Sequence, residues 1–223
     1  MLNCADMYRR ILTGIIAQGK TADFLAAMRE SAAREAGRGI RQRTSIWGAM
    51  TGQTNGVLIA SDFNTLEELE KFTEIAARDA SFAAIRRAVR SQMVYEHSEV
   101  EILRLAYHSD GLISSEDATA PRHYMRTLRG AGQPGRHREF ISAISEALEY
   151  QKARGIDATT SVWSSVTGGT SGVSVVAEFD TLAELEKFDQ MAAQDAGFAQ
   201  HRAASRSAMV FLTSDVQLLR NLM

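Results

Sequence analysis

The chain has 223 residues, of which 45% are hydrophobic and 23% are charged, a balance typical of a folded globular protein. Its formal net charge of −2 provides no field that would attract nucleic acid or an anionic membrane surface. The single cysteine, Cys4, excludes an internal disulfide. No apolar run approaches the ~20 residues that span a bilayer. We therefore expect a cytoplasmic protein without a nucleic-acid or membrane partner.

The second half of the chain repeats the first at a constant offset. Ser45-Ile46-Trp47 matches Ser161-Val162-Trp163, 116 positions later. The match runs from 8–104 onto 124–220 without insertion or deletion, which predicts two copies of one structural unit. The sequence is divided accordingly into a first repeat (1–106), a linker (107–121) and a second repeat (122–223).

Hydrophobic periodicity predicts the order strand, helix, strand, strand, helix, strand in each repeat. In the first repeat these are a strand over 7–16, a helix from 19–23 to Gly37 and Gly39, strands over 40–50 and 57–63, a helix from Thr65 with a further helical piece from about Asp79, and a strand over 93–103. The second repeat has strands near Tyr124, Ile156, Val173 and Met209, and helices opening near His137 and Thr181. This βαββαβ order is the ferredoxin-like arrangement.

A four-stranded sheet with both helices on one face leaves its other face uncovered. That face carries Trp47 and is partly apolar, so its exposure to water is unfavourable. Packing the two sheets of the chain against each other removes this cost. We therefore predict an α+β fold in which two tandem ferredoxin-like repeats form an intrachain pseudo-twofold α+β barrel with the helices outside.

Several matched polar segments have structural explanations. The glycine-rich turns 51–56 and 167–172 connect strand to strand, whereas a phosphate loop leads into a helix, so hairpin turns are favoured. Thr65 with Glu68, and Thr181 with Glu184, have the spacing of a capping box. Asp79 and Asp195 precede the last helical piece of each repeat and are predicted to cap it.

The candidate ligand-binding residues come from two pairs of strands. The two tryptophans should point into the barrel, where an indole either fills the core, which we favour, or forms an apolar ligand wall. A tyrosine and an arginine recur with period two on the first strand of each repeat. If these side chains face inward, the buried guanidinium needs a partner, such as an anionic ligand. Alternatively, the arginines point to solvent near the end of the strand. These residues are Trp47, Trp163, Tyr8, Arg10, Tyr124 and Arg126.

Two further sets of residues are candidates for ligand binding. Arg86 and Arg90, matched by Arg202 and Arg206, lie one helical turn apart and could receive a carboxylate or phosphate, although ion pairs with a neighbouring helix explain them more simply. His201, beside Phe198 on the last helix, is the candidate for an axial haem ligand, while a packing role is favoured. We predict no cofactor and no metal. No nucleophile motif identifies a catalytic residue.

The order of elements, the duplication and two strings carry a family resemblance. The strings are residues 179–188 (FDTLAELEKF) and 195–198 (DAGF), the latter matched by 79–82 in the first repeat. The chain resembles the dimeric α+β barrel superfamily, most closely its NIPSNAP-type and antibiotic-biosynthesis-monooxygenase-type domains. The resemblance implies the barrel fold, and the superfamily includes cofactor-free monooxygenases, haem-binding enzymes, isomerases and proteins without known activity.

Three functions follow as hypotheses. The first is a barrel that binds a small apolar or anionic molecule, with a pocket between sheet and helices or within the barrel, and acts as a cofactor-independent monooxygenase- or isomerase-like enzyme. The second is a non-catalytic structural or interaction protein of NIPSNAP type, and the third is a haem protein. Divergence between the copies, as at 41–44 and 157–160, fits one functional half and fits neutral drift equally. Relatives of this fold often associate, which favours a homodimer.

Overall fold

The computed structural model describes residues 7–40, 42–111, 122–167 and 171–223, with the side chains of 95–98 and 209–215 excepted. Cys4 and most of the predicted linker lie outside these residues. The elements are β1 (Tyr8–Ile16), α1 (Thr21–Gly37), β2 (Arg43–Ala49), β3 (Gly56–Phe63), α2 (Leu66–Arg78), α3 (Ala80–Ser91), β4 (Met93–His108), β5 (Tyr124–Gly132), α4 (His137–Ala153), β6 (Thr159–Ser165), β7 (Gly172–Phe179), α5 (Leu182–Gln194), α6 (Ala196–Ser207) and β8 (Met209–Asn221).

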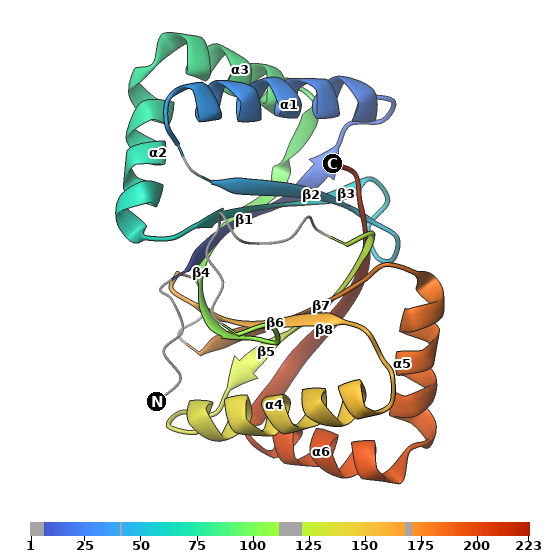
Figure 1. Cartoon of the computed structure of the whole chain (residues 1–223). Coiled ribbons are helices and arrows are strands. Elements are labelled where there is room, and N and C mark those ends of the chain that lie inside the picture. The colour runs from blue at the N-terminus through green and yellow to red at the C-terminus, as the bar shows by residue number, and fades with distance from the viewer. Residues whose placement is uncertain (1–6, 41, 112–121, 168–170) are drawn as a thin grey trace.

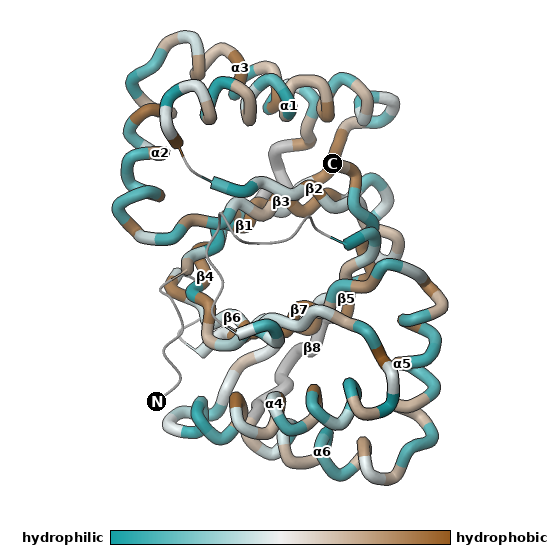
Figure 2. The backbone as a smooth tube through the Cα atoms, in the orientation of Figure 1, coloured by the Kyte–Doolittle hydropathy of each residue, from teal (hydrophilic) through white to brown (hydrophobic). Residues whose placement is uncertain are grey.

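The strands form one closed barrel, which confirms the predicted fold. Their order is β1-β3-β2-β8-β5-β7-β6-β4, and every pairing is antiparallel. Each repeat thus contributes four neighbouring strands to the barrel. Within a repeat, the fourth, first, third and second strands follow one another, which is the ferredoxin-like order. The helices α1 to α3 cover one side of the barrel and α4 to α6 the other (Figure 1). Hydrophilic residues recur along these helices (Figure 2).

Two seams between the repeats close the barrel. The long strand β4 pairs with β6, and β8 pairs with β2. The seams obey the internal symmetry, because the Val166 amide donates to the Ile102 carbonyl at 2.8 Å and the Met50 amide donates to the Leu218 carbonyl at 2.9 Å. Since β4 runs on to His108, the fourth strand is longer than the predicted segment 93–103. The extra length reaches the other repeat.

The barrel interior is an apolar core built around the two tryptophans. Trp47 and Trp163 are 1% and 0% exposed and belong to one buried cluster with side chains from both repeats, including Met125 and Leu219. Each indole N–H donates to a serine hydroxyl two residues earlier on its own strand, to Ser45 at 3.0 Å and Ser161 at 2.8 Å. These bonds satisfy the only polar atom of each indole, so the rings can be buried without an unpaired donor.

One ion pair interrupts this apolar interior. The Arg9 guanidinium donates from Nε to Asp62 Oδ1 at 2.6 Å and from Nη2 to Oδ2 at 2.9 Å. Both residues are buried, and the guanidinium carbon of Arg9 lies 4.1 Å from the centre of the Trp163 ring. A bidentate pair with a cation–π contact compensates much of the cost of burying the two charges.

Polar N-caps begin α2, α3, α5 and α6 at the positions that the sequence predicts, whereas α1 and α4 begin without a side-chain cap. Thr181 and Glu184 form a complete capping box, and Thr65 Oγ1 accepts from the Glu68 amide at 3.1 Å. Asp195 accepts hydrogen bonds from the Tyr150 hydroxyl at 2.7 Å and from the Phe198 amide at 2.9 Å. The first of these bonds is the main cause that lowers the pKa of Asp195 to about 2.

This cap predicts an acid-sensitive contribution to stability. Because the folded-state pKa of Asp195 lies below its unfolded value of about 3.9, its contribution is complete above that value and is lost as the pH falls toward about 2. We expect the melting temperature to decline less steeply between pH 4 and 2 in Asp195→Asn than in the unaltered protein. Differential scanning calorimetry across this range, with Asp23→Asn on an exposed first turn as control, measures the effect. Parallel declines in all three proteins would contradict it.

Candidate functional site

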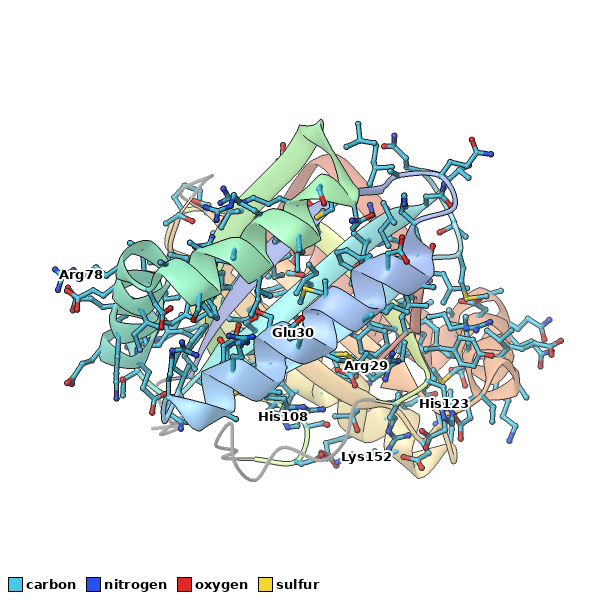
Figure 3. All side chains as sticks on the ribbon, turned by 90° about the horizontal axis from the view of Figure 1, so that it is seen from above. Arg29, Glu30, Arg78, His108, His123 and Lys152 are labelled. Carbon is cyan, nitrogen blue, oxygen red and sulfur yellow. The ribbon has the colours of Figure 1, made fainter. Side chains whose placement is uncertain are left out.

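A cavity of about 240 Å³ lies in the first repeat, between the outer face of the sheet and the helices. Helices α1 and α3 lie side by side across the strands above it (Figure 3). Its floor comes from β1, β2, β3 and β4, and its cover mainly from α1 and α3. The lining residues are Arg10, Leu12, Met28, Ser31, Ala32, Glu35, Gln42, Thr44, Ile59, Ser61, Phe72, Phe82, Arg86, Val89, Arg90, Met93 and Val100.

Strand register arranges the floor in a polar row and an adjacent apolar row. Arg10 is opposite Ser61, and Ser61 is opposite Thr44, so the three side chains cross the sheet on one level. The hydroxyl oxygens of Thr44 and Ser61 are 3.2 Å apart and share a hydrogen bond. Two residues along the strands, Leu12 is opposite Ile59. Because side chains two positions apart share a face, the floor presents both a polar and an apolar strip.

Glu35 brings a carboxylate into the cavity from α1. It is 7% exposed, and its Oε1 accepts a hydrogen bond from the Ser31 hydroxyl at 2.9 Å. Its Oε2 accepts from the side-chain amide of Gln42. Burial raises the pKa of Glu35, although these two hydrogen bonds and the nearby arginines oppose the rise. A carboxyl group with a raised pKa keeps its proton to a higher pH than an ordinary glutamate does, as many general acids and bases do.

Arg10 is the cation on the floor of the same cavity. Burial lowers the pKa of Arg10, and the positive charges of Arg86 and Arg90 on α3 lower it further, whereas Glu35 opposes them. Like charges held close together in a partly buried site disfavour one another unless an anion is near. The cavity therefore has a positive region beside a single carboxylate among its lining residues.

The second repeat keeps the arginines but arranges them differently. The Arg126 guanidinium lies 5.2 Å from the centre of the Phe188 ring, and Arg202 donates to the Ala192 carbonyl at 3.1 Å. Leu148 and Gln151, both buried, stand at the positions of Ala32 and Glu35. Helix α4 also packs more extensively on α6 than α1 does on α3. At one of these positions, therefore, the second repeat has a larger apolar side chain, Leu148 in place of Ala32.

The structure separates the predicted site residues into two groups. Trp47 and Trp163 pack in the barrel core and do not line the first-repeat cavity. Arg9 occupies the inner face of β1, so Tyr8 and Arg10 point to the helix-covered face, as do Tyr124 and Arg126 on β5. Only Arg10 of the predicted six lines the cavity. Sequence reasoning missed Glu35, although its spacing continues the buried stripe of Phe24, Met28 and Ser31 along α1.

Other candidate features give weaker sites. A second, open hollow runs along one helix, α5, which alone cannot enclose a ligand. His201 packs with its ring centre 5.0 Å from that of Tyr150 and lines neither cavity, so the described residues around it do not fit haem. Among the residues that the structure describes, no three potential ligands gather to hold a metal. Within the same residues, no helix is both long and apolar enough to cross a bilayer.

Solved structures with this architecture are similar over almost the whole chain. An anthrone oxidase-like protein aligns with a TM-score of 0.63 at 11% identity, over 100% of this chain and 93% of its own. A candidate monooxygenase from Fusobacterium nucleatum gives 0.66 at 11% identity, over 98% and 94%. Chlorite dismutase from Candidatus Nitrospira defluvii gives 0.57 at 8% identity, over 96% and 90%.

Comparison by sequence adds no further relative. No protein-family model matches the chain, and no curated protein matches it. At identities this low the solved structures establish the fold alone. The chain has the fold of the dimeric α+β barrel superfamily, with both halves of the barrel in one polypeptide.

Proposed function

We propose that the first-repeat cavity binds a small organic molecule and that Glu35 removes a proton from it without a cofactor. The observation that carries this proposal is a buried carboxyl group with a raised pKa that lines a partly apolar cavity. Ser31 and Gln42 hold the carboxylate in place through hydrogen bonds. A base that is fixed in orientation and shielded from water is effective in proton abstraction.

The proposed step is a simple proton transfer. The ligand's C–H or O–H bond breaks, its electron pair stays on the ligand, and the proton forms a new O–H bond with Glu35. The resulting enolate or phenolate lies near the Arg10 cation, which stabilises its charge. Return of the proton to another carbon is isomerisation. In oxygenation, the electron pair of the same anion forms a C–O bond with dioxygen, the resulting peroxide takes the proton back from Glu35, and loss of water, with the second hydrogen of that carbon, leaves a carbonyl group. The similarity to an anthrone oxidase-like protein and to a candidate monooxygenase supports this type of chemistry.

Replacement of the base tests the proposal. We expect the unaltered protein to accelerate hydrogen–deuterium exchange at the methylene groups of 2-indanone, a small enolisable ketone, as followed by NMR. Glu35→Gln should lower the accelerated rate by about 10²–10⁴, the usual contribution of a general base. The rate should rise with pH as Glu35 loses its proton, at a higher pH than for an ordinary glutamate because burial raises its pKa.

Glu30→Gln is the matched control, since it makes the same change on the exposed side of the same helix (Figure 3). It should leave the rate unchanged. If 2-indanone exchanges no faster with the protein than with buffer, or if Glu35→Gln keeps full activity, the catalytic proposal is wrong. Either result would favour the non-catalytic structural or interaction role.

We also infer that the chain forms a homodimer, through its helical surfaces or its strand edges. The barrel closes over short seams, because β4 pairs with β6 over Leu103–His108 and β8 pairs with β2 over Leu219–Asn221. Among the described residues, the earlier parts of β4 and β8 therefore have a neighbouring strand on one side, and their other edge can pair with a second chain.

A further inference from the structure

The cavity combines three features that restrict the ligand it can hold. Its floor has a polar row, Arg10–Ser61–Thr44, next to an apolar pair, Leu12 and Ile59. The ring side chains of Phe72 and Phe82 and the thioethers of Met28 and Met93 add apolar wall. A ligand that satisfies both parts has a polar group at one end and an apolar body at the other.

The charge of the polar part favours an anion. Arg10 comes from the floor, and Arg86 and Arg90 come from α3 above it. All three arginines line the same cavity, and the positive charges of Arg86 and Arg90 lower the pKa of Arg10 while the negative charge of Glu35 opposes them. A carboxylate can accept two parallel hydrogen bonds from a guanidinium and reduces the repulsion among the cations. The hydroxyls of Ser61 and Thr44 share a hydrogen bond, and the one that accepts in it keeps its own proton as a further donor beside Arg10.

The volume limits the apolar body. About 240 Å³ is smaller than the roughly 300–1,000 Å³ of sites for drug-sized ligands. A body of one ring, or of two fused rings, suits this space.

We propose that the ligand of the first-repeat cavity is a small ring-bearing carboxylate, whose carboxylate group is bound by Arg10 in the Arg10–Ser61–Thr44 row and whose ring lies against Leu12, Ile59 and the aromatic wall. The inference rests on the proposed function in one respect, the use of this cavity as the ligand site. It adds the charge class of the ligand and the residue that recognises it.

Isothermal titration calorimetry on the unaltered protein tests whether the cavity prefers an anionic ligand. The probes are benzoate and 1-naphthoate, and their neutral amides are the matched controls. Both carboxylates should bind at least about tenfold more tightly than the amides, because only the anion forms charge-assisted bonds with the guanidinium. Their affinity should fall with added salt. Equal binding of acid and amide, or no binding of any probe, would overturn the inference.

Two substitutions locate the site, and the second repeat supplies the controls. Arg10→Met should weaken binding of the carboxylates at least about tenfold, whereas Arg126→Met, at the matched position, should not. Ala32→Leu should block binding by filling the cavity, and Leu148 at the equivalent position shows that the fold accommodates this side chain. Unchanged affinity in Ala32→Leu would place the carboxylate elsewhere and refute the assignment.

These outcomes are separable from failure of the proposed function. Tight carboxylate binding that depends on Arg10, without accelerated proton exchange, would support the ligand class and refute the role of Glu35. Accelerated exchange that is lost in Glu35→Gln, with equal binding of benzoate and benzamide, would support the base and refute the ligand class.

Discussion

Asp62→Ala should lower the free energy of unfolding by about 3 kcal/mol or more, because it leaves the Arg9 guanidinium without its bidentate partner inside the barrel. Removal of one member of a buried ion pair typically costs about 3–5 kcal/mol. We expect a loss of unfolding free energy near the lower end of this range, because the negative charge of Glu178 also stabilises the Arg9 cation. Urea unfolding followed by tryptophan fluorescence measures the change.

The second repeat suggests the control for this prediction. Met125 stands at the position that matches Arg9 and is buried in the same core cluster. The double variant Arg9→Met/Asp62→Leu removes both charges and keeps the volume apolar, so its loss should be well below that of Asp62→Ala alone. The double variant also takes the charge of Arg9 away from Glu178, which keeps that of Arg43, so Arg9→Met alone measures this part of the loss. If the double variant is less stable than both Asp62→Ala and Arg9→Met, the unpaired charge is not the cause of the destabilisation.

Trp163→Ala is expected to cost about 3–5 kcal/mol of unfolding free energy, the usual range for removal of a large buried aromatic side chain. The indole is fully buried at the meeting of the two repeats, and it also carries the Arg9 guanidinium on its face. Trp47→Ala removes an equally buried indole, and among the described residues a cation–π contact to an indole is found at Trp163. Trp163→Ala should therefore be the more destabilising of the two, by about the 0.5–2 kcal/mol of a cation–π contact.

Chemical denaturation of the two alanine variants compares their free energies of unfolding. Where an alanine variant does not fold, Trp47→Phe or Trp163→Phe is measured instead. Each phenylalanine variant should be less destabilised than the alanine variant because it keeps part of the buried surface. A stability equal to that of the unaltered protein in Trp163→Phe and Trp163→Ala alike would exclude a core role. Loss of ligand binding at unchanged stability would instead indicate a ligand wall.

The fold could be predicted because its signals are repeated and local. Period-two strands, capped helices and the constant 116-residue offset occur twice, so each copy supports the interpretation of the other. The seams are different, since the pairing of β4 with β6 joins residues of different repeats and leaves no local pattern. The sequence therefore predicts the barrel, whereas the strands that join its two halves are known only from the structure.

The candidate site could be predicted only in part, for two physical reasons. Strand periodicity predicts which residues share a face of the sheet. It does not predict which face points into the barrel, and because Arg9 and Arg10 are adjacent arginines, their charge does not decide it either. The structure places Arg9 inside and Arg10 under the helices. Glu35 then reaches Arg10 from α1 through tertiary packing, which a single sequence does not encode at short range.

A barrel assembled from two identical chains would have to carry the same outer face twice, because every substitution appears in both. Here a substitution such as leucine at 148 changes one face and leaves alanine at 32 on the other. The covalent duplication thus frees each half to evolve under its own constraint. One half can maintain an open chamber while the other becomes a closely packed support that stabilises it.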